Sequence, residues 1–109
     1  MPRMDRISKY KTKVTTDDSG NYRVIRVKLF NTVVVEIKPS LNKVRLCTGG
    51  YRTNTTKNRI NQAMKVYGYD IRVFQKNYQW YVRQGNSINE FSTDDMELEA
   101  IAVEGVGNV

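Results

Sequence analysis

The 109-residue sequence contains no histidine and a single cysteine. The absence of histidine excludes catalytic triads, general bases and metal sites that use an imidazole ring. Because Cys47 is the only cysteine, the chain cannot form an internal disulfide or a metal site made of several cysteines. The longest apolar runs, residues 33–35 and 100–103, are far shorter than the ~20 residues of a membrane-spanning helix. The first six residues lack the apolar stretch of a secretory signal. We therefore expect no cofactor, no metal and no membrane.

Acidic residues are scarce in most of the chain and concentrated at its end. Residues 1–93 hold all 18 lysines and arginines and six acids, a net charge of +12, whereas residues 94–109 hold five acids and no base. No acid lies between Glu36 and Asp70, although seven bases do. Such a stretch attracts polyanions or acidic protein surfaces. The alternative is that these charges only keep the surface well solvated. We expect a single basic α+β domain over residues 1–93 and an acidic C-terminal tail over residues 94–109 that weakly covers it.

Hydrophobic periodicity predicts an α+β fold, an antiparallel β-meander of about six to seven short strands with one helix packed on the sheet. The alternating segments are residues 8–14, 22–30, 33–38, 43–48, 71–76, 78–84 and 87–91. The helix, at about residues 56–67, carries an apolar stripe of Ile60, Ala63, Met64 and Tyr67, with Thr55 as the expected N-cap and Gly68 as the stop. For the tail, residues 95–103 fit either a short helix or a disordered segment, and we expect residues 105–109 to be frayed.

The segment between the fourth expected strand and the helix is a candidate anion-binding turn. Paired glycines, Gly49 and Gly50, let backbone N–H groups point into a concavity, and the helix start at Thr55 offers further donors. Arg52 and Lys57 flank this turn. The spacing is not that of a Walker loop. The alternative is a plain strand-to-helix turn in which the glycines supply geometry and Thr55 only caps the helix.

Nucleic acid is the partner that best fits these basic residues. In the sequence, lysines and arginines alternate with aromatic residues, and unpaired nucleobases stack on exposed aromatic rings of this kind. The alternation of the strands, however, turns about half of the rings toward the core, and Trp80 is the best core anchor. The expected nucleic-acid-binding residues are Arg52, Lys57, Arg59 and Lys65, with Tyr51 as a stacking ring.

Catalysis has little support in this sequence. The acids are scattered, and no pair of carboxylates shares a helix face within residues 1–93. Cys47 has no histidine to activate it, which favours a structural role. We expect that the protein is not an enzyme.

The run from Leu46 to Gln62 resembles a pattern in small uncharacterised proteins of tailed bacteriophages, Leu-x-Thr-Gly-Gly-aromatic-Arg-Thr-x-Thr-Thr followed by a short helix. The segment from Trp80 to Phe91 is similar to the end of the same proteins, so that the resemblance covers about residues 20–92. The chain differs in having Tyr51 where tryptophan is usual and in its longer acidic tail. The resemblance implies a phage product in the cytoplasm of the infected bacterial host and brings no function with it.

Three functional hypotheses follow from the charge and this resemblance. The first is a small basic phage-type binding protein that contacts nucleic acid during infection. The alternative is a protein-binding inhibitor that docks on an acidic face of a host enzyme or defence complex. The third is a small virion component.

Overall fold

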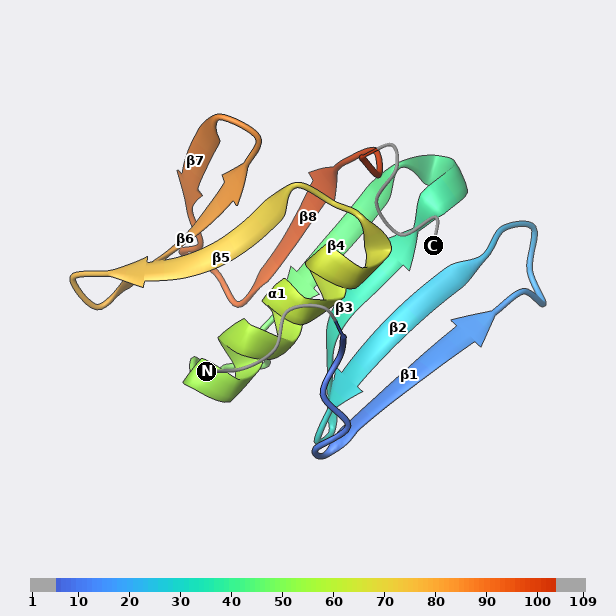
Figure 1. Ribbon diagram of the computed structural model, residues 1–109, viewed down its shortest axis with the longest axis horizontal. Helices are drawn as coiled ribbons and strands as arrows, with labels where there is room; N and C mark the ends of the chain where they lie inside the picture. Colours follow the sequence, from blue (N-terminus) through green and yellow to red (C-terminus); the bar gives the residue numbers. More distant parts are fainter. Residues whose placement is uncertain (1–5, 104–109) are drawn as a thin grey trace.

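The computed structural model describes residues 6–103, which form eight antiparallel strands and one α-helix (Figure 1). The elements are β1 (Thr12–Asp17), β2 (Val24–Leu29), β3 (Thr32–Lys38), a 3-10 turn (Pro39–Leu41), β4 (Lys43–Cys47), α1 (Asn54–Tyr67), β5 (Ile71–Lys76), β6 (Gln79–Gln84), β7 (Ser87–Glu90) and β8 (Asp95–Glu99). The expected α+β class and the antiparallel pairing are confirmed. The single meander is wrong, because the strands form two sheets.

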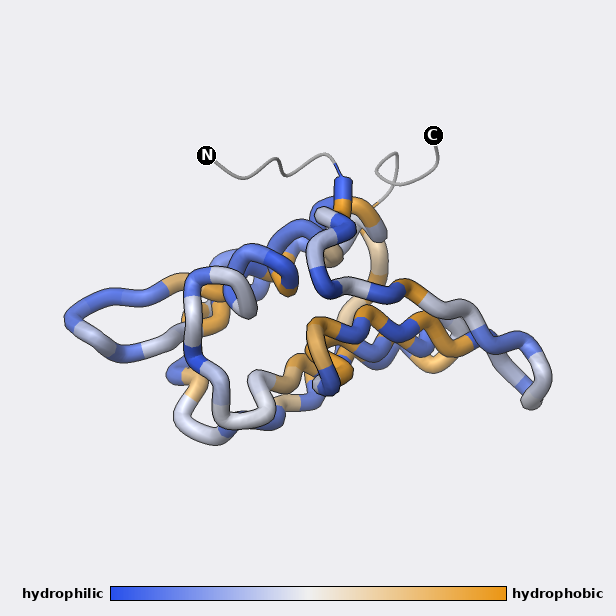
Figure 2. The backbone as a smooth tube through the Cα atoms, turned by 90° about the horizontal axis from the view of Figure 1, so that it is seen from below, coloured by the Kyte–Doolittle hydropathy of each residue, from blue (hydrophilic) through white to orange (hydrophobic). Residues whose placement is uncertain are grey.

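The large sheet has the strand order β1-β2-β3-β4-β8 and buries one of its faces under the helix. Strand pairing aligns Val27, Val35 and Leu46 in one row across the sheet, and all three are fully buried. Figure 2 shows the alternation of hydrophobic and hydrophilic residues along these strands and the helix on one side of them. Strict alternation fails at Val34, which is buried next to Val35, because a β-bulge at Val27 and Lys28 shifts the register there.

Strand β1 begins four residues later than the alternation predicts. The pattern places a strand over residues 8–14, but β1 runs from Thr12 to Asp17, and Lys11 has a left-handed φ of 47°. The φ of Lys11 and the hydrogen bond from the Thr12 N–H to the Lys9 carbonyl, 3.2 Å, form a turn there. Lys9 and Lys11 therefore lie on a loop and do not line a strand face.

Helix α1 starts and ends at clear capping residues. Its N-cap is Thr53, whose hydroxyl accepts a 3.1 Å hydrogen bond from the Thr56 N–H, so the expected cap at Thr55 is wrong. Thr55 lies inside the first turn. The helix ends as expected at Gly68, which has a left-handed φ of 81°. Ile60, Ala63 and Met64 are fully buried against the sheets, as the spacing predicts, whereas Tyr67, the fourth residue of the expected stripe, is partly buried.

The small sheet, β5-β6-β7, is not paired with the large one, and its strand β5 packs along the helix. Asn61 of α1 donates to the Val73 carbonyl and accepts from the Val73 N–H, both at 2.8 Å, and so covers the edge of β5 in place of a neighbouring strand. Trp80 is buried on the inner face, in edge-to-face contact with the Phe91 ring at 6.4 Å. The expected role of Trp80 as a core anchor is therefore confirmed.

The beginning of the acidic tail is an ordered strand. Residues 95–99 form β8, which pairs with β4 and directs Met96 and Leu98 toward the core, so both expected forms of this segment, helix and disorder, are wrong. The strand is favoured because acidic and apolar residues alternate with period two, which lets β8 complete the edge of the sheet. The fraying expected at residues 105–109 lies outside the described residues.

Candidate nucleic-acid interface

A carboxylate of the chain itself, that of Asp94, lies beside the turn at Gly49 and Gly50, where Thr48 and Arg52 donate to it. Both glycines have left-handed φ values, 61° and 85°, and a Cβ on Gly49 would lie 2.7 Å from the Thr32 hydroxyl, so only glycine fits there. The Gly50 N–H donates to the Thr48 hydroxyl, which donates in turn to the Asp94 carboxylate at 2.6 Å. This hydrogen bond and the nearby Arg52 guanidinium hold the pKa of Asp94 below its usual range.

Arg52 ties the beginning of the tail to this turn. Its guanidinium donates to Asp94 Oδ1 at 3.1 Å and to the carbonyl oxygens of Phe91 and Thr93 at 2.8 and 3.1 Å. The same group lies 5.7 Å from the centre of the Trp80 ring and 5.8 Å from that of Phe91. Three acceptors and two rings engage a side chain that is 30% exposed, so Arg52 has little capacity left for a phosphate.

Arg59 lies inside the molecule. The residue is 4% exposed, and its guanidinium donates to the Thr12 hydroxyl at 2.7 Å, the Gln62 side-chain oxygen at 2.8 Å and the Tyr10 carbonyl at 3.3 Å. Burial lowers its pKa from the ordinary value. Arg59 thus fastens the loop before β1 to the helix, and a polyanion at the surface does not reach it.

The other three expected contact residues remain at the surface but do not converge. Lys57 and Lys65 lie two turns apart on α1, a rise of roughly 12 Å. The Lys57 ammonium is 5.9 Å from the centre of the Trp80 ring. Tyr51, 67% exposed, lies on the wall of a separate cavity of about 350 Å³ near the β2–β3 turn. The structure therefore leaves Lys57 and Lys65 as surface cations on one helix, brings Lys57 and Arg52 to the same Trp80 ring, and places Arg59 inside the molecule.

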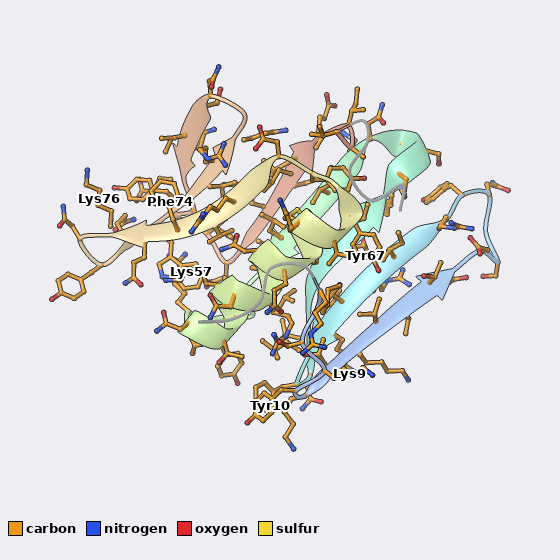
Figure 3. The ribbon with its side chains drawn as sticks, in the orientation of Figure 1. Lys9, Tyr10, Lys57, Tyr67, Phe74 and Lys76 are labelled. Atoms are coloured by element: carbon orange, nitrogen blue, oxygen red, sulfur yellow. The ribbon has the colours of Figure 1, made fainter. Side chains whose placement is uncertain are left out.

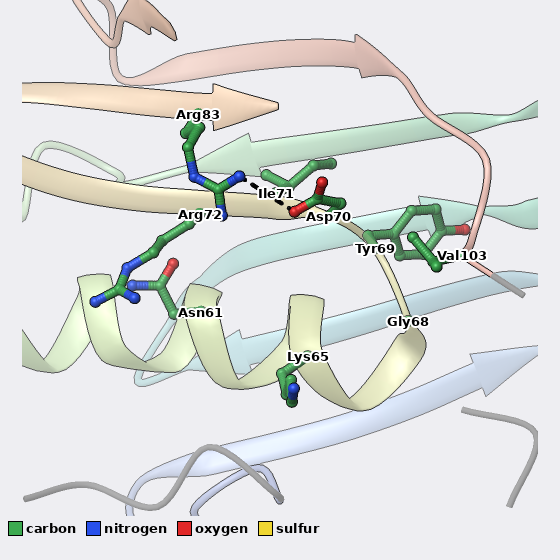
Figure 4. Close-up of a pocket in the computed structure, with 9 residues that line it drawn as sticks. All are labelled: Asn61, Lys65, Gly68, Tyr69, Asp70, Ile71, Arg72, Arg83 and Val103. Carbon is green, nitrogen blue, oxygen red and sulfur yellow. Dashed lines mark hydrogen bonds and ion pairs between the residues drawn. The ribbon is translucent and has the colours of Figure 1, made fainter. Parts of the chain in front are cut away.

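A second cavity, of about 470 Å³, lies where the end of α1 meets the start of β5 (Figure 4). Three basic residues, Lys65, Arg72 and Arg83, line it together with Asp70. Arg83 pairs with Asp70 at 3.3 Å, whereas Lys65 and Arg72 have no acidic partner among residues 6–103. The cavity therefore has a basic rim that continues from the helix onto the small sheet.

The face of the small sheet turned away from the core combines aromatic and basic side chains. The interleaving of rings and basic residues in the sequence includes Tyr81 and Arg83 of this face, but neither is among the expected contact residues. Strand pairing places these residues on it in three rows: Arg72, Arg83 and Ile88; Phe74, Tyr81 and Glu90; Lys76 and Gln79. We call this surface the outer face. The alternation in residues 71–76 and 79–84 contained this signal, but choosing the exposed half of each strand requires knowledge of the register.

Ion pairs divide the basic residues of the chain into two classes. On the exposed face of the large sheet, Glu99 pairs with Lys43 at 3.0 Å and Asp95 pairs with Arg45, each across the β4–β8 ladder. Glu36 pairs with Arg26 at 3.0 Å in the same sheet. By contrast, several bases have no acidic partner within the described part of the chain: Lys57, Lys65, Arg72 and Lys76 on the helix and small sheet, and Lys9, Lys11, Lys13 and Lys28 around β1.

The model of one protein family, the Kyanoviridae Gp96 protein, matches residues 2–99. The chain belongs to this family. Membership in the Gp96 family makes it a phage protein, which confirms the coarse form of the resemblance; the Leu-x-Thr-Gly-Gly pattern stays a prediction. Comparisons with curated proteins and with solved structures find no match. Within residues 6–103, no helix of this Gp96 family member is long and apolar enough to cross a membrane.

Groups that could hold a metal ion do not cluster in the described residues. No set of three or more Cys, Asp or Glu side chains between residues 6 and 103 is placed to hold a metal ion. Cys47 is partly buried in β4 and has a free thiol. Every buried side-chain nitrogen and oxygen in residues 6–103 has a hydrogen-bond partner.

Proposed function

We propose that this phage protein is a non-enzymatic nucleic-acid-binding protein that acts during infection. The observation that carries the proposal is the distribution of unpaired charge. Acids from β8 and Glu36 engage Lys43, Arg45 and Arg26 on the exposed face of the large sheet, whereas two groups of basic residues, one on the helix and small sheet and one around β1, have no acidic partner among the described residues.

Basic residues without acidic partners favour a polyanion for a physical reason. Lysine and arginine side chains that contact phosphates displace the counterions condensed on the nucleic acid. The release of these ions raises the entropy, so binding weakens steeply as the salt concentration increases. Lysines and arginines that already have acidic partners contribute less to this binding, because an ion pair would have to break before a phosphate could bind. The exposed face of β3, β4 and β8 is therefore not the expected contact region. We propose the basic residues of the helix and small sheet as the contact, and those around β1 serve as the comparison in the test.

The test is a titration of fluorescent DNA and RNA oligonucleotides, single-stranded and duplex, over a series of salt concentrations. Replacing Lys57 and Lys65 by glutamine is expected to weaken binding several-fold and to lower the salt slope by about one to two. The matched control replaces Lys9 and Lys11, which removes the same charge from a loop on the other side of the helix. Equal losses from both pairs indicate diffuse attraction without a site. The absence of binding to any oligonucleotide at low salt contradicts the proposal and favours an acidic host protein as partner.

A further inference from the structure

The outer face of the small sheet carries a stacked aromatic pair at its centre. Phe74 and Tyr81 lie opposite each other on β5 and β6, with ring centres 5.5 Å apart and planes inclined by 22°. Both residues are partly exposed, whereas Trp80, their neighbour in the chain, is buried on the opposite face. The pair therefore presents aromatic surface to solvent beside the fully packed core.

The β5–β6 hairpin adds a third ring that the fold does not explain. Tyr78 is 96% exposed, and both turn residues, Asn77 and Tyr78, have left-handed φ values of 51° and 66°. Turns of this kind favour glycine at the second position, since a bulky residue there is strained. Tyr78 thus occupies an unfavourable backbone conformation without burying its ring. A strained residue without a packing role is a reason to look for a binding role.

The charges around these rings suit an anionic partner. Arg72 and Lys76 stand on either side of Phe74 along β5, and neither has an acidic partner in residues 6–103. Figure 3 shows Lys76 and Phe74 projecting from the same side of the strand. Two acids lie nearby, but Arg83 pairs with Asp70, and Gln79 donates to Glu90. Gln79 is neutral, so Glu90 keeps its charge; within residues 6–103 the outer face thus carries two basic residues without an acidic partner, Arg72 and Lys76, and one carboxylate without a basic partner.

We infer that the outer face binds single-stranded nucleic acid, with unpaired bases stacking on Tyr78, Tyr81 and Phe74 while Arg72 and Lys76 contact the phosphates. This inference rests on the proposed function. A solvent-facing antiparallel sheet with aromatic residues in its central row accepts about two or three unstacked bases. In a duplex the faces of the bases are covered by their neighbours, so the rings gain nothing from it. From Arg72 to Lys76 the strand spans roughly 13 Å, enough to reach more than one phosphate.

The decisive variant is Tyr78→Gly, because its effects on folding and on binding are expected to have opposite signs. Glycine adopts the left-handed conformation without strain, so the melting temperature is expected to stay equal or rise. Loss of one stacking ring is expected to weaken binding of a single-stranded DNA by about fivefold or more. Misfolding cannot produce this combination. The matched control is Tyr22→Gly, which removes an exposed ring from the loop between β1 and β2 and is expected to leave the affinity within about twofold.

The experiment measures fluorescence anisotropy of four strands of equal length: single-stranded DNA, single-stranded RNA, the DNA duplex and an abasic sugar-phosphate strand. Preference for the base-containing single strands, reduced by Tyr78→Gly and spared by Tyr22→Gly, supports the inference. Equal affinity for single-stranded, duplex and abasic strands, unchanged by Tyr78→Gly, overturns it and leaves nucleic-acid binding by charge intact. Failure to bind any of the four at low salt overturns both this inference and the proposed function.

Discussion

Arg52 is expected to stabilise the fold, although its position beside a glycine turn favoured a phosphate contact. The change to test is Arg52→Gln, which removes the planar guanidinium that joins Asp94, Phe91 and Thr93 to the turn. The ion pair with Asp94 is partly exposed and contributes at most about 1 kcal/mol. Each hydrogen bond to a backbone carbonyl contributes about 1 kcal/mol, and contact with the rings adds about 0.5 kcal/mol.

Together these contributions predict that Arg52→Gln lowers the free energy of unfolding by about 2–3 kcal/mol. For a domain of this size the melting temperature falls by about 10 °C. Arg52→Lys is expected to lose most of the same stability, because an ammonium group cannot donate to three acceptors in one plane. The assay is urea unfolding followed by the fluorescence of Trp80, the only tryptophan, which lies under Arg52.

The matched control is Arg72→Gln, an exposed arginine on the outer face, which is expected to change the free energy of unfolding by less than about 0.5 kcal/mol. The reasoning is refuted if Arg52→Gln leaves the unfolding curve unchanged and instead reduces affinity for oligonucleotides. That result would return Arg52 to the contact role that the sequence predicted.

Three further predictions concern the core, the tail and acid stability. Met64→Asp places an unpaired charge at a fully buried position, so calorimetry should show a severe loss of melting temperature, and a neutral outcome would contradict the packing of α1. Replacing Glu97 and Glu99 by glutamine keeps β8 but releases Lys43, so polyanion affinity at low salt should rise; an unchanged affinity would show that β8 does not shield the basic residues. The pKa of Asp94 is lowered in the folded state, so its contribution to stability is present above the unfolded value of about 4 and is lost as the pH falls through the folded value. The free energy of unfolding, measured as the pH is lowered from about 4, should depend less on pH for Asp94→Asn than for the unchanged protein. Parallel pH curves for the two proteins would contradict the stabilising role of the Asp94 carboxylate.

Local patterns predicted most of the fold. The helix stripe ending at Gly68 and the alternation in β2 to β7 are properties of consecutive residues, and the structure has elements at those places. Two local details could not be predicted from the sequence. Several threonines near the helix start are equally suited to capping, and only the extended backbone at Thr53 decides between them. The bulge that buries Val34 depends on its partner strand and cannot be read from β3 alone.

The contacts that decide the candidate site join residues far apart in the chain. Asp94 reaches the glycine turn from 46 residues away, and Arg59 meets Thr12 across 47. Sequence reasoning identified basic residues and a turn suited to an anion, but it could not show that a carboxylate of the chain bonds to Thr48 and Arg52 beside that turn. The outer face likewise depends on register, since a shift by one residue would exchange Phe74 and Tyr81 for residues of the core face.

The central claim is that the protein contacts nucleic acid through the small sheet, and ultraviolet crosslinking in infected cells tests it most directly. Crosslinked protein is digested with trypsin, and mass spectrometry locates any attached nucleotide. The account predicts nucleotide adducts on the peptide of residues 77–83, which contains Tyr78 and Tyr81 and is released by cleavage after Lys76 and Arg83. Protein free of nucleotide adducts, recovered with a protein partner that persists after nuclease treatment, would contradict it.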